Sequence, residues 1–324
     1  MAADPQPGAE APLISIPDAP APAGGRAEWV EGSAGVRLRA ALFPAAGEVR
    51  GSVVLSPGRT EPIEKYFEVI GDLTGRGFVV LAHDWRGQGL SQRLLPDRLR
   101  GHAEGFEAYL DDHRAMLDAF AARLPRPWIA LGHSMGGALE LLVLAKGERR
   151  FEAAFLSAPM LAIATRPWPA WLALRIVRLS GWLGRSRDYA LPVYDPAGDR
   201  FGFDRLTHDR ARYDRYKAQL RACPELAIGA LTWGWLDFAL NAGAALAEKG
   251  ALEAVRIPVA IVAAGQDHLV LNAVDRAAAR RLPKGSYLEI EGAYHEILME
   301  TDAVRARVWA AFDQLAEDIT SPRA

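Results

Sequence analysis

The pentapeptide Gly-His-Ser-Met-Gly at 132–136 sets a serine between two glycines, directly after an apolar run and directly before a helical pattern. The apolar run 128–131 predicts a buried strand, and residues 138–145 predict a helix. A serine in a sharp strand-to-helix turn exposes its hydroxyl, and such a turn needs very small neighbours. The N-terminus of the following helix also favours a developing negative charge. We therefore interpret Ser134 as a catalytic nucleophile, with a glycine-rich turn of no chemical role as the alternative.

Short apolar runs and helical patterns alternate along most of the chain. The runs are aliphatic or β-branched and are bounded by Gly or Pro, which is typical of buried strands. Strands joined by helices predict a doubly wound, mostly parallel α/β sheet, which binds ligands at the carboxyl ends of its strands. The predicted strands span 36–43, 51–56, 78–82, 128–131, 153–156, 258–264 and 286–290, and the predicted helices between and after them include 64–76, 106–123, 270–281 and 304–316.

The alternation stops between residues 161 and 255, where helical stretches and loops appear without a convincing strand. This interval predicts a helical cap inserted between two strands of a core that comprises 27–160 and 256–324. Residues 1–26 are rich in Ala, Pro and Gly, and prolines disfavour both helix and sheet. We therefore expect 1–26 to form an extended arm laid over the core.

Composition narrows the functional classes. The formal net charge of −2 offers no basic field for nucleic acid. Cys223 is the single cysteine, so neither an intramolecular disulfide nor a cysteine-rich zinc site can form. No apolar run of about 18 residues predicts a transmembrane helix, and the N-terminus lacks the basic start and apolar block of a secretory signal. We expect a cytoplasmic protein.

A serine hydroxyl needs a base to take its proton, and that base needs an orienting carboxylate. The expected chain order is nucleophile, acid, base. Asp267 follows the strand 258–264, and His295 follows the strand 286–290. We interpret Asp267 as the acid and His295 as the base, with a structural loop carboxylate as the alternative for Asp267. The other histidines are not expected to be the base; they are His83, His102, His113, His133, His208 and His268.

The tetrahedral intermediate formed by such a serine needs backbone N–H donors. One expected donor is the N–H of Met135, directly after the nucleophile. The other is the N–H of Arg59, in the loop after the strand 51–56, where Gly58 would allow the backbone to approach closely.

These motifs resemble the bacterial lysophospholipase and monoacylglycerol lipase group of α/β hydrolases, and the chain is most similar to the bacterial lysophospholipases. The resemblance runs from about residue 51 to the C-terminal helix. It implies the α/β-hydrolase fold and hydrolysis of a carboxylic ester that bears one fatty acyl chain, without a metal or organic cofactor. The motifs are Pro-Gly-Arg-Thr-Glu at 57–61, His-Asp-Trp-Arg-Gly-Gln-Gly-Leu-Ser at 83–91, Gly-His-Ser-Met-Gly-Gly at 132–137, Leu-Thr-His-Asp at 206–209 and Gly-Ala-Tyr-His-Glu-Ile-Leu at 292–298.

The chain departs from this group in the loop after the strand 51–56. Many relatives have His-Gly where this chain has Pro57-Gly58, and a small residue where it has Arg59. One interpretation is an ion pair between Arg59 and Glu61 or Glu64; the other is recognition of a phosphorylated glycerol headgroup, because Arg pairs well with phosphate. Asp84 and Arg86 belong to a turn that the resemblance implies is structural.

Five of the nine tryptophans lie in the predicted cap. An apolar cap above Ser134 would form an acyl-chain pocket. The stretch 167–183 combines Trp, Leu and Arg, which suits peripheral contact with an anionic bilayer, although such a helix can also pack on the core. The expected substrate-binding residues are Gly58, Arg59, His133, Trp168, Trp171 and Trp233.

Other functions remain open at this stage. A monoacylglycerol lipase, a general carboxylesterase, a cofactor-free haloperoxidase or an aminopeptidase would keep the triad and change the pocket. Epoxide and haloalkane hydrolases are disfavoured because they place Asp where this chain has Ser134. A non-enzymatic binding protein would usually have lost a member of the triad, and all three residue types are present.

Overall fold

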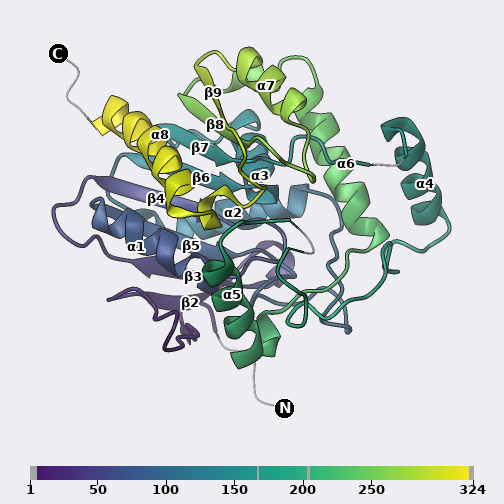
Figure 1. Cartoon of the computed structure of the whole chain (residues 1–324), viewed down its shortest axis with the longest axis horizontal. Helices are drawn as coiled ribbons and strands as arrows, with labels where there is room; N and C mark the ends of the chain where they lie inside the picture. Colours follow the sequence, from purple (N-terminus) through teal and green to yellow (C-terminus); the bar gives the residue numbers. More distant parts are fainter. Residues whose placement is uncertain (1–5, 166–167, 203–204, 321–324) are drawn as a thin grey trace.

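The computed structural model describes residues 6–165, 168–202 and 205–320, and within them nine strands form one sheet (Figure 1). Its strand order is β1-β2-β3-β5-β4-β6-β7-β8-β9. The pairs from β5 to β9 are parallel, and the pairs that involve β1, β2 and β3 are antiparallel. The strands are β1 Glu10–Ala11, β2 Arg26–Glu31, β3 Arg37–Phe43, β4 Gly51–Ser56, β5 Phe78–Asp84, β6 Trp128–His133, β7 Ala153–Ser157, β8 Val259–Ala264 and β9 Gly285–Ile290.

Helices cover both faces of the sheet, as the predicted α/β-hydrolase fold requires. Every residue of β4, β5 and β6 is buried. Phe312 of α8 packs edge-on against Phe78 and Phe155 of the sheet, and α1 shares that side. Helices α2, α3 and α7 contribute to the core on the opposite face. These helices are α1 Phe67–Gly75, α2 Glu107–Phe120, α3 Met135–Ala145, α7 Asn272–Arg281 and α8 Asp302–Thr320.

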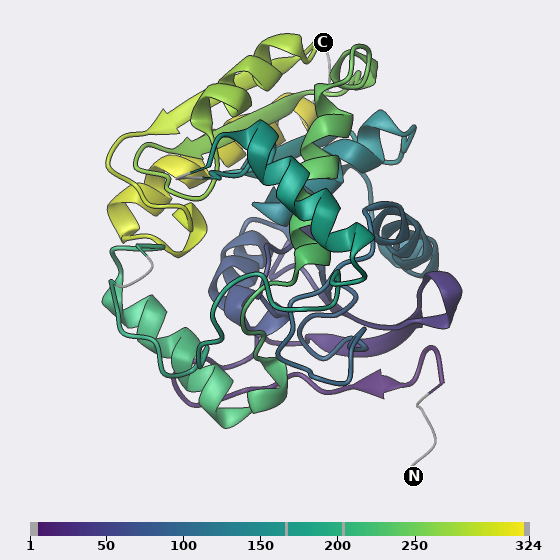
Figure 2. The same cartoon turned by 90° about the vertical axis from the view of Figure 1, so that its right-hand side faces the viewer.

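Three further helices lie between β7 and β8: α4 Ala170–Trp182, α5 Arg210–Ala222 and α6 Trp233–Ala247. Helix α6 packs on α3, and α4 packs on the outer side of α6. Figure 2 shows α4 in front of α6, with α5 well apart from both. Within the described residues no helix is both long and apolar enough to cross a bilayer. Short 3-10 turns lie at Ser33–Gly35, Ile63–Tyr66, Ala121–Arg123, Pro224–Leu226, Leu252–Ala254 and Ile297–Met299.

Part of the N-terminal segment joins the sheet. Residues Glu10 and Ala11 form the edge strand β1 and pair with β2. The two residues fit between Pro7 and Pro12, so no proline has to occupy a ladder position. The segment is also tied to the core, because Arg39 donates from Nη1 to the carbonyl of Pro12 at 2.9 Å. Residues 1–5 of the predicted arm, and residues 166–167 at the start of the predicted lipid-facing stretch, lie outside the described residues.

Candidate active site

The serine turn between β6 and α3 has the backbone that its glycines predict. Ser134 has φ 50° and ψ −116°, a strained backbone conformation that residues other than glycine rarely adopt. A Cβ on Gly136 would lie 2.1 Å from the carbonyl oxygen of Ser56, and one on Gly132 would lie 2.7 Å from Gly137. Gly136 is therefore required where the turn packs against the end of β4, and Gly132 where it packs against the start of α3.

The structure brings Ser134, His295 and Asp267 together from three separate loops. Nε2 of His295 lies 2.9 Å from Oγ of Ser134, and Nδ1 lies 2.6 Å from Oδ2 of Asp267. The other carboxylate oxygen of Asp267 accepts the main-chain N–H groups of Leu269 and Val270. Burial opposes ionisation of Asp267, but these hydrogen bonds and the His295 contact hold its pKa below the usual value. This geometry fits a serine activated by an oriented imidazole.

The predicted oxyanion donors are the backbone amides of Arg59 and Met135. Met135 is the first residue of α3. In the loop after β4, Gly58 donates its N–H to Glu61 Oε2 at 2.6 Å, and Thr60 donates its N–H to Gln88 Oε1 at 2.6 Å. Within the described part of the chain, the backbone N–H of Arg59 has no hydrogen-bond acceptor. The backbone N–H of Met135 has none outside its own helix α3. The neighbouring bonds thus hold the loop while leaving the amide of Arg59 available.

A buried ion network joins the loop after β4 to the loop that carries His295, and the sequence analysis did not predict it. Lys65 Nζ lies 2.8 Å from Glu61 Oε1 and 2.6 Å from Glu296 Oε1. Glu296 directly follows His295, while Glu61 holds the amide of Gly58. Burial opposes the charged form of Glu61, but Lys65 lowers its pKa to about 2. Glu61 and Glu296 belong to the sequence motifs 57–61 and 292–298, but no local pattern indicated that Lys65 would contact both of them.

The insertion also holds the loop after β4. Tyr216 of α5 donates its hydroxyl to the carbonyl of Thr60 at 2.5 Å, and Thr60 has a positive φ of 66°. The guanidinium of Arg59 donates to the carbonyl of Gly229 and lies over the ring of Trp235, 5.4 Å from its centroid.

The expected ion pair of Arg59 with Glu61 or Glu64 is wrong. Glu61 is held by Lys65, and Glu64 makes a two-pronged contact with the buried Arg39. Among the described residues no carboxylate lies within ion-pair distance of Arg59. Its Nε is buried without a hydrogen-bond partner, and burial lowers the pKa of the guanidinium.

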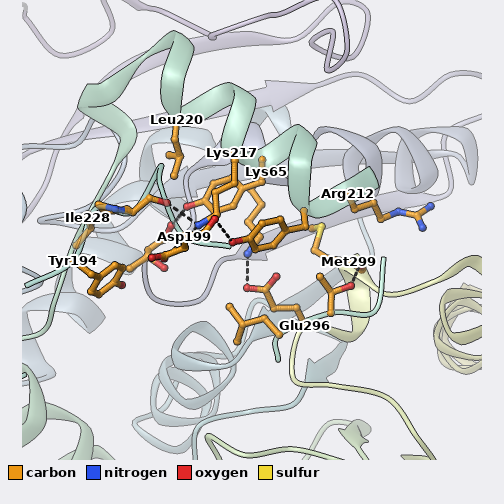
Figure 3. Close-up of a pocket in the computed structure, with 15 residues that line it drawn as sticks. Lys65, Tyr194, Asp199, Arg212, Lys217, Leu220, Ile228, Glu296 and Met299 are labelled. Carbon is orange, nitrogen blue, oxygen red and sulfur yellow. Dashed lines mark hydrogen bonds and ion pairs between the residues drawn. The ribbon is translucent and has the colours of Figure 1, made fainter. Parts of the chain in front are cut away.

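A small pocket, partly open to solvent, lies between α5 and the core (Figure 3). Thr60, next to Arg59, and Glu296, next to His295, both line it. It therefore adjoins the predicted site. Figure 3 shows the ammonium group of Lys65 in contact with the carboxylate of Glu296 at its wall. The remaining lining mixes aromatic, basic and apolar side chains and includes Tyr194, Arg212, Tyr213, Tyr216, Lys217, Leu220, Ile228 and Met299.

The predicted substrate-binding residues are spread out. His133 is buried, with Nδ1 3.0 Å from the carbonyl of Ser157, and burial lowers its pKa to about 4 despite the nearby Glu61. Trp168 and Trp171 are more than half exposed, and Trp233 is half-buried. None of these residues lines the pocket described above. Gly58 is needed for packing, since a Cβ there would lie 2.5 Å from Glu61 Oε2.

The turn after β5 has structural partners. Asp84 accepts Nε of Arg39 at 2.7 Å and the main-chain N–H of Ile63 at 3.0 Å. Arg86 forms a two-pronged contact with Asp112. In the described ranges, no three His, Cys, Asp or Glu side chains are grouped to hold a metal ion.

The charge of Asp267 acts on a second carboxylate, that of Asp275. Asp275 of α7 is fully buried, and within the described residues neither of its carboxylate oxygens has a hydrogen-bond partner. Burial and the charge of Asp267 raise the pKa of Asp275 to about 8. Asp275 is therefore mostly neutral at pH 7.

Known proteins resemble this chain over most of its length. The model of the family described as serine aminopeptidase, S33, matches residues 47–302. Lysophospholipase L2 of Escherichia coli is 36% identical over 265 residues, which cover 78% of this chain and 76% of the relative. Monoacylglycerol lipase of Mycolicibacterium smegmatis is 27% identical, covering 84% of this chain and 90% of that protein. A soluble variant of monoglyceride lipase from Saccharomyces cerevisiae, solved with a substrate analog, superposes with a TM-score of 0.71 at 21% identity, covering 90% of this chain and 95% of that one.

Proposed function

This chain belongs to the serine aminopeptidase S33 family of α/β hydrolases, and from that premise we propose that it hydrolyses the carboxylic ester of single-acyl-chain lipids, chiefly lysophospholipids. The observation that carries the chemistry is the 2.9 Å contact between Ser134 Oγ and His295 Nε2, with Asp267 behind the imidazole. The 36% identity to a lysophospholipase supports the substrate class. We place the enzyme in the cytoplasm.

The proposed reaction follows from these positions. His295 takes the hydroxyl proton as Ser134 attacks the ester carbonyl, and Asp267 stabilises the imidazolium that forms. The N–H groups of Arg59 and Met135 bind the oxyanion of the tetrahedral intermediate. His295 then protonates the departing alcohol and leaves an acyl group on Ser134. Water, deprotonated by His295, releases the fatty acid and restores the serine.

Arg59 is the proposed contact for a phosphorylated headgroup. In the described part of the chain, the guanidinium of Arg59, in the loop after β4, lies without a carboxylate partner, and its Nε has no hydrogen-bond partner. A phosphate oxygen would supply a charge-assisted acceptor. The alternative role is structural, because the guanidinium already holds the carbonyl of Gly229.

A substrate panel tests the proposal. We expect the wild-type protein to hydrolyse lysophospholipids with a higher kcat/KM than monoacylglycerols of the same acyl chain, and to leave aminoacyl amides intact. A preference for monoacylglycerols would favour the lipase alternative. Faster turnover of aminoacyl amides would favour a peptidase, which the name of the family model brings into consideration. No turnover of any ester would contradict the proposal.

A further inference from the structure

One face of α4 carries large apolar and basic side chains in solvent. Trp171, Arg175, Arg178 and Trp182 are spaced by four, three and four residues, so they share one side of the helix. Trp171 is 59% exposed and Trp182 is 82% exposed. Leu179, which borders them, is 54% exposed. We call these five residues the α4 face.

The opposite side of α4 is anchored to the protein. Val177 points away from the α4 face in the helical repeat and is buried, and the helix packs on α6. Figures 1 and 2 both show α4 as the outer layer beyond α6. The tryptophans are therefore exposed because the helix is held in this orientation.

The stretch of sequence that carries the α4 face has charged residues of a single sign. No acidic residue occurs between Glu152 and Asp188, whereas this stretch contains five arginines. Among the described residues no carboxylate lies within ion-pair distance of Arg175 or Arg178, and the guanidinium of Arg175 lies over the ring of Trp171, 5.2 Å from its centroid.

The segment that leads into α4 is joined to the acid loop of the candidate site. Ala164 donates its N–H to the carbonyl of Leu269 at 2.8 Å, and Leu271 donates its N–H to the carbonyl of Ala162 at 3.0 Å. Leu269 and Leu271 are themselves 46% and 43% exposed. Exposed apolar side chains thus occur both on α4 and two and four residues beyond Asp267.

We propose that the α4 face docks this protein onto an anionic lipid surface. Trp and Leu side chains favour the boundary between headgroups and acyl chains, and the arginines bind lipid phosphates. A second copy of the chain is a poorer occupant, because a twofold contact would bring the Arg175 and Arg178 of both copies together without acids. The biological sense of docking rests on the proposed lipid substrate, but the binding itself does not.

Vesicle sedimentation tests the docking without any turnover. The full chain carrying Ser134→Ala is mixed with phosphatidylglycerol–phosphatidylcholine vesicles or with pure phosphatidylcholine vesicles, at low and high salt. We expect binding to the anionic vesicles that weakens with salt. Arg175→Glu with Arg178→Glu should reduce partitioning by about 25-fold or more, since each charge contributes about fivefold. Trp182→Ala should weaken binding at both salt concentrations.

Matched variants separate docking from general charge. Arg280→Glu with Arg307→Glu alters two exposed arginines of α7 and α8 by the same charge and should bind like the parent. The same α4 substitutions, made in the protein that retains Ser134, should leave cleavage of a short soluble ester at the wild-type rate. Absence of binding at low salt, equal binding to neutral vesicles, or equal loss in the control pair would overturn the proposal. Self-association abolished by Trp182→Ala, without vesicle binding, would do the same and assign the face to a second copy. Ester cleavage without docking would overturn this inference alone.

Discussion

The hydroxyl of Tyr216 in α5 lies 2.5 Å from the carbonyl oxygen of Thr60, in the loop that precedes the nucleophile in sequence and adjoins it in space. Thr60 follows the proposed oxyanion donor Arg59. A helix of the insertion therefore helps to position a backbone group of the proposed catalytic machinery.

Tyr216→Phe should lower kcat on a short soluble ester by roughly tenfold with little change in KM, less than the 10²–10³ lost with a whole oxyanion donor. The reason is that the phenol fixes the loop without touching a small substrate. Tyr213→Phe, which removes a hydroxyl from the same helix that bonds to the carbonyl of Asp199, is the matched control. Equal effects of the two variants on kcat would contradict a positioning role for Tyr216.

Lys65→Met should destabilise the fold by about 3–5 kcal/mol, because it removes the ammonium group that contacts the buried carboxylates of both Glu61 and Glu296. Urea denaturation at pH 7 measures the free energy of unfolding. Lys249→Met, at an exposed position, should change it by less than about 0.5 kcal/mol. A decrease of less than about 1 kcal/mol in the free energy of unfolding of Lys65→Met would contradict a strongly stabilising ion network.

Asp275 should make stability fall as the pH rises. Its pKa is raised to about 8 in the folded chain, against about 4 when unfolded, so the folded state holds this proton more tightly. The contribution is complete below about pH 4 and is lost between pH 4 and 8.

Asp275→Asn removes that dependence, and at pH 9 it should be more stable than wild type by up to roughly 5 kcal/mol. Urea denaturation at pH 5 and pH 9 measures the difference, with the exposed Asp214→Asn as control. If the free energy of unfolding changed by the same amount between pH 5 and pH 9 in wild type and in Asp275→Asn, that result would contradict a neutral, buried Asp275.

Arg59→Ala should lower kcat/KM for a lysophospholipid about tenfold more than for a monoacylglycerol with the same acyl chain, since a charge-assisted hydrogen bond to phosphate would be lost. Both substrates should share any additional loss caused by releasing Gly229. Measuring both on one preparation separates the two roles. Equal losses would assign Arg59 to holding the loop and not to the headgroup.

The sequence predicted those parts of the molecule that local pattern determines. The buried strands were identified because uninterrupted apolar runs mark them, and Ser134 and Asp267 were selected because each follows such a strand. His295 was selected because it follows β9, which is mostly exposed or half-buried. Strand β2, Arg26–Glu31, was missed because its charged residues interrupt the apolar pattern. Helix α3 begins three residues earlier than predicted because the turn itself opens the helix.

The unpredicted parts depend on contacts between distant segments. Lys65 and Glu296 are 231 residues apart, and Tyr216 and Thr60 are 156 apart. Asp275 looks like an ordinary polar residue of an amphipathic helix, and only the packing of α7 buries it. Arg59 could be identified as unusual, but its neighbours Gly229 and Trp235 come from the insertion and have no sequence signal.

The most direct test compares wild type and Ser134→Ala on a lysophospholipid, with fatty-acid release as the readout and thermal unfolding to confirm the fold. We predict that the substitution removes nearly all turnover, with a loss of roughly 10⁶-fold, while leaving unfolding unchanged. A folded Ser134→Ala protein that releases fatty acid at a rate within tenfold of wild type would contradict the assignment of Ser134 as the nucleophile.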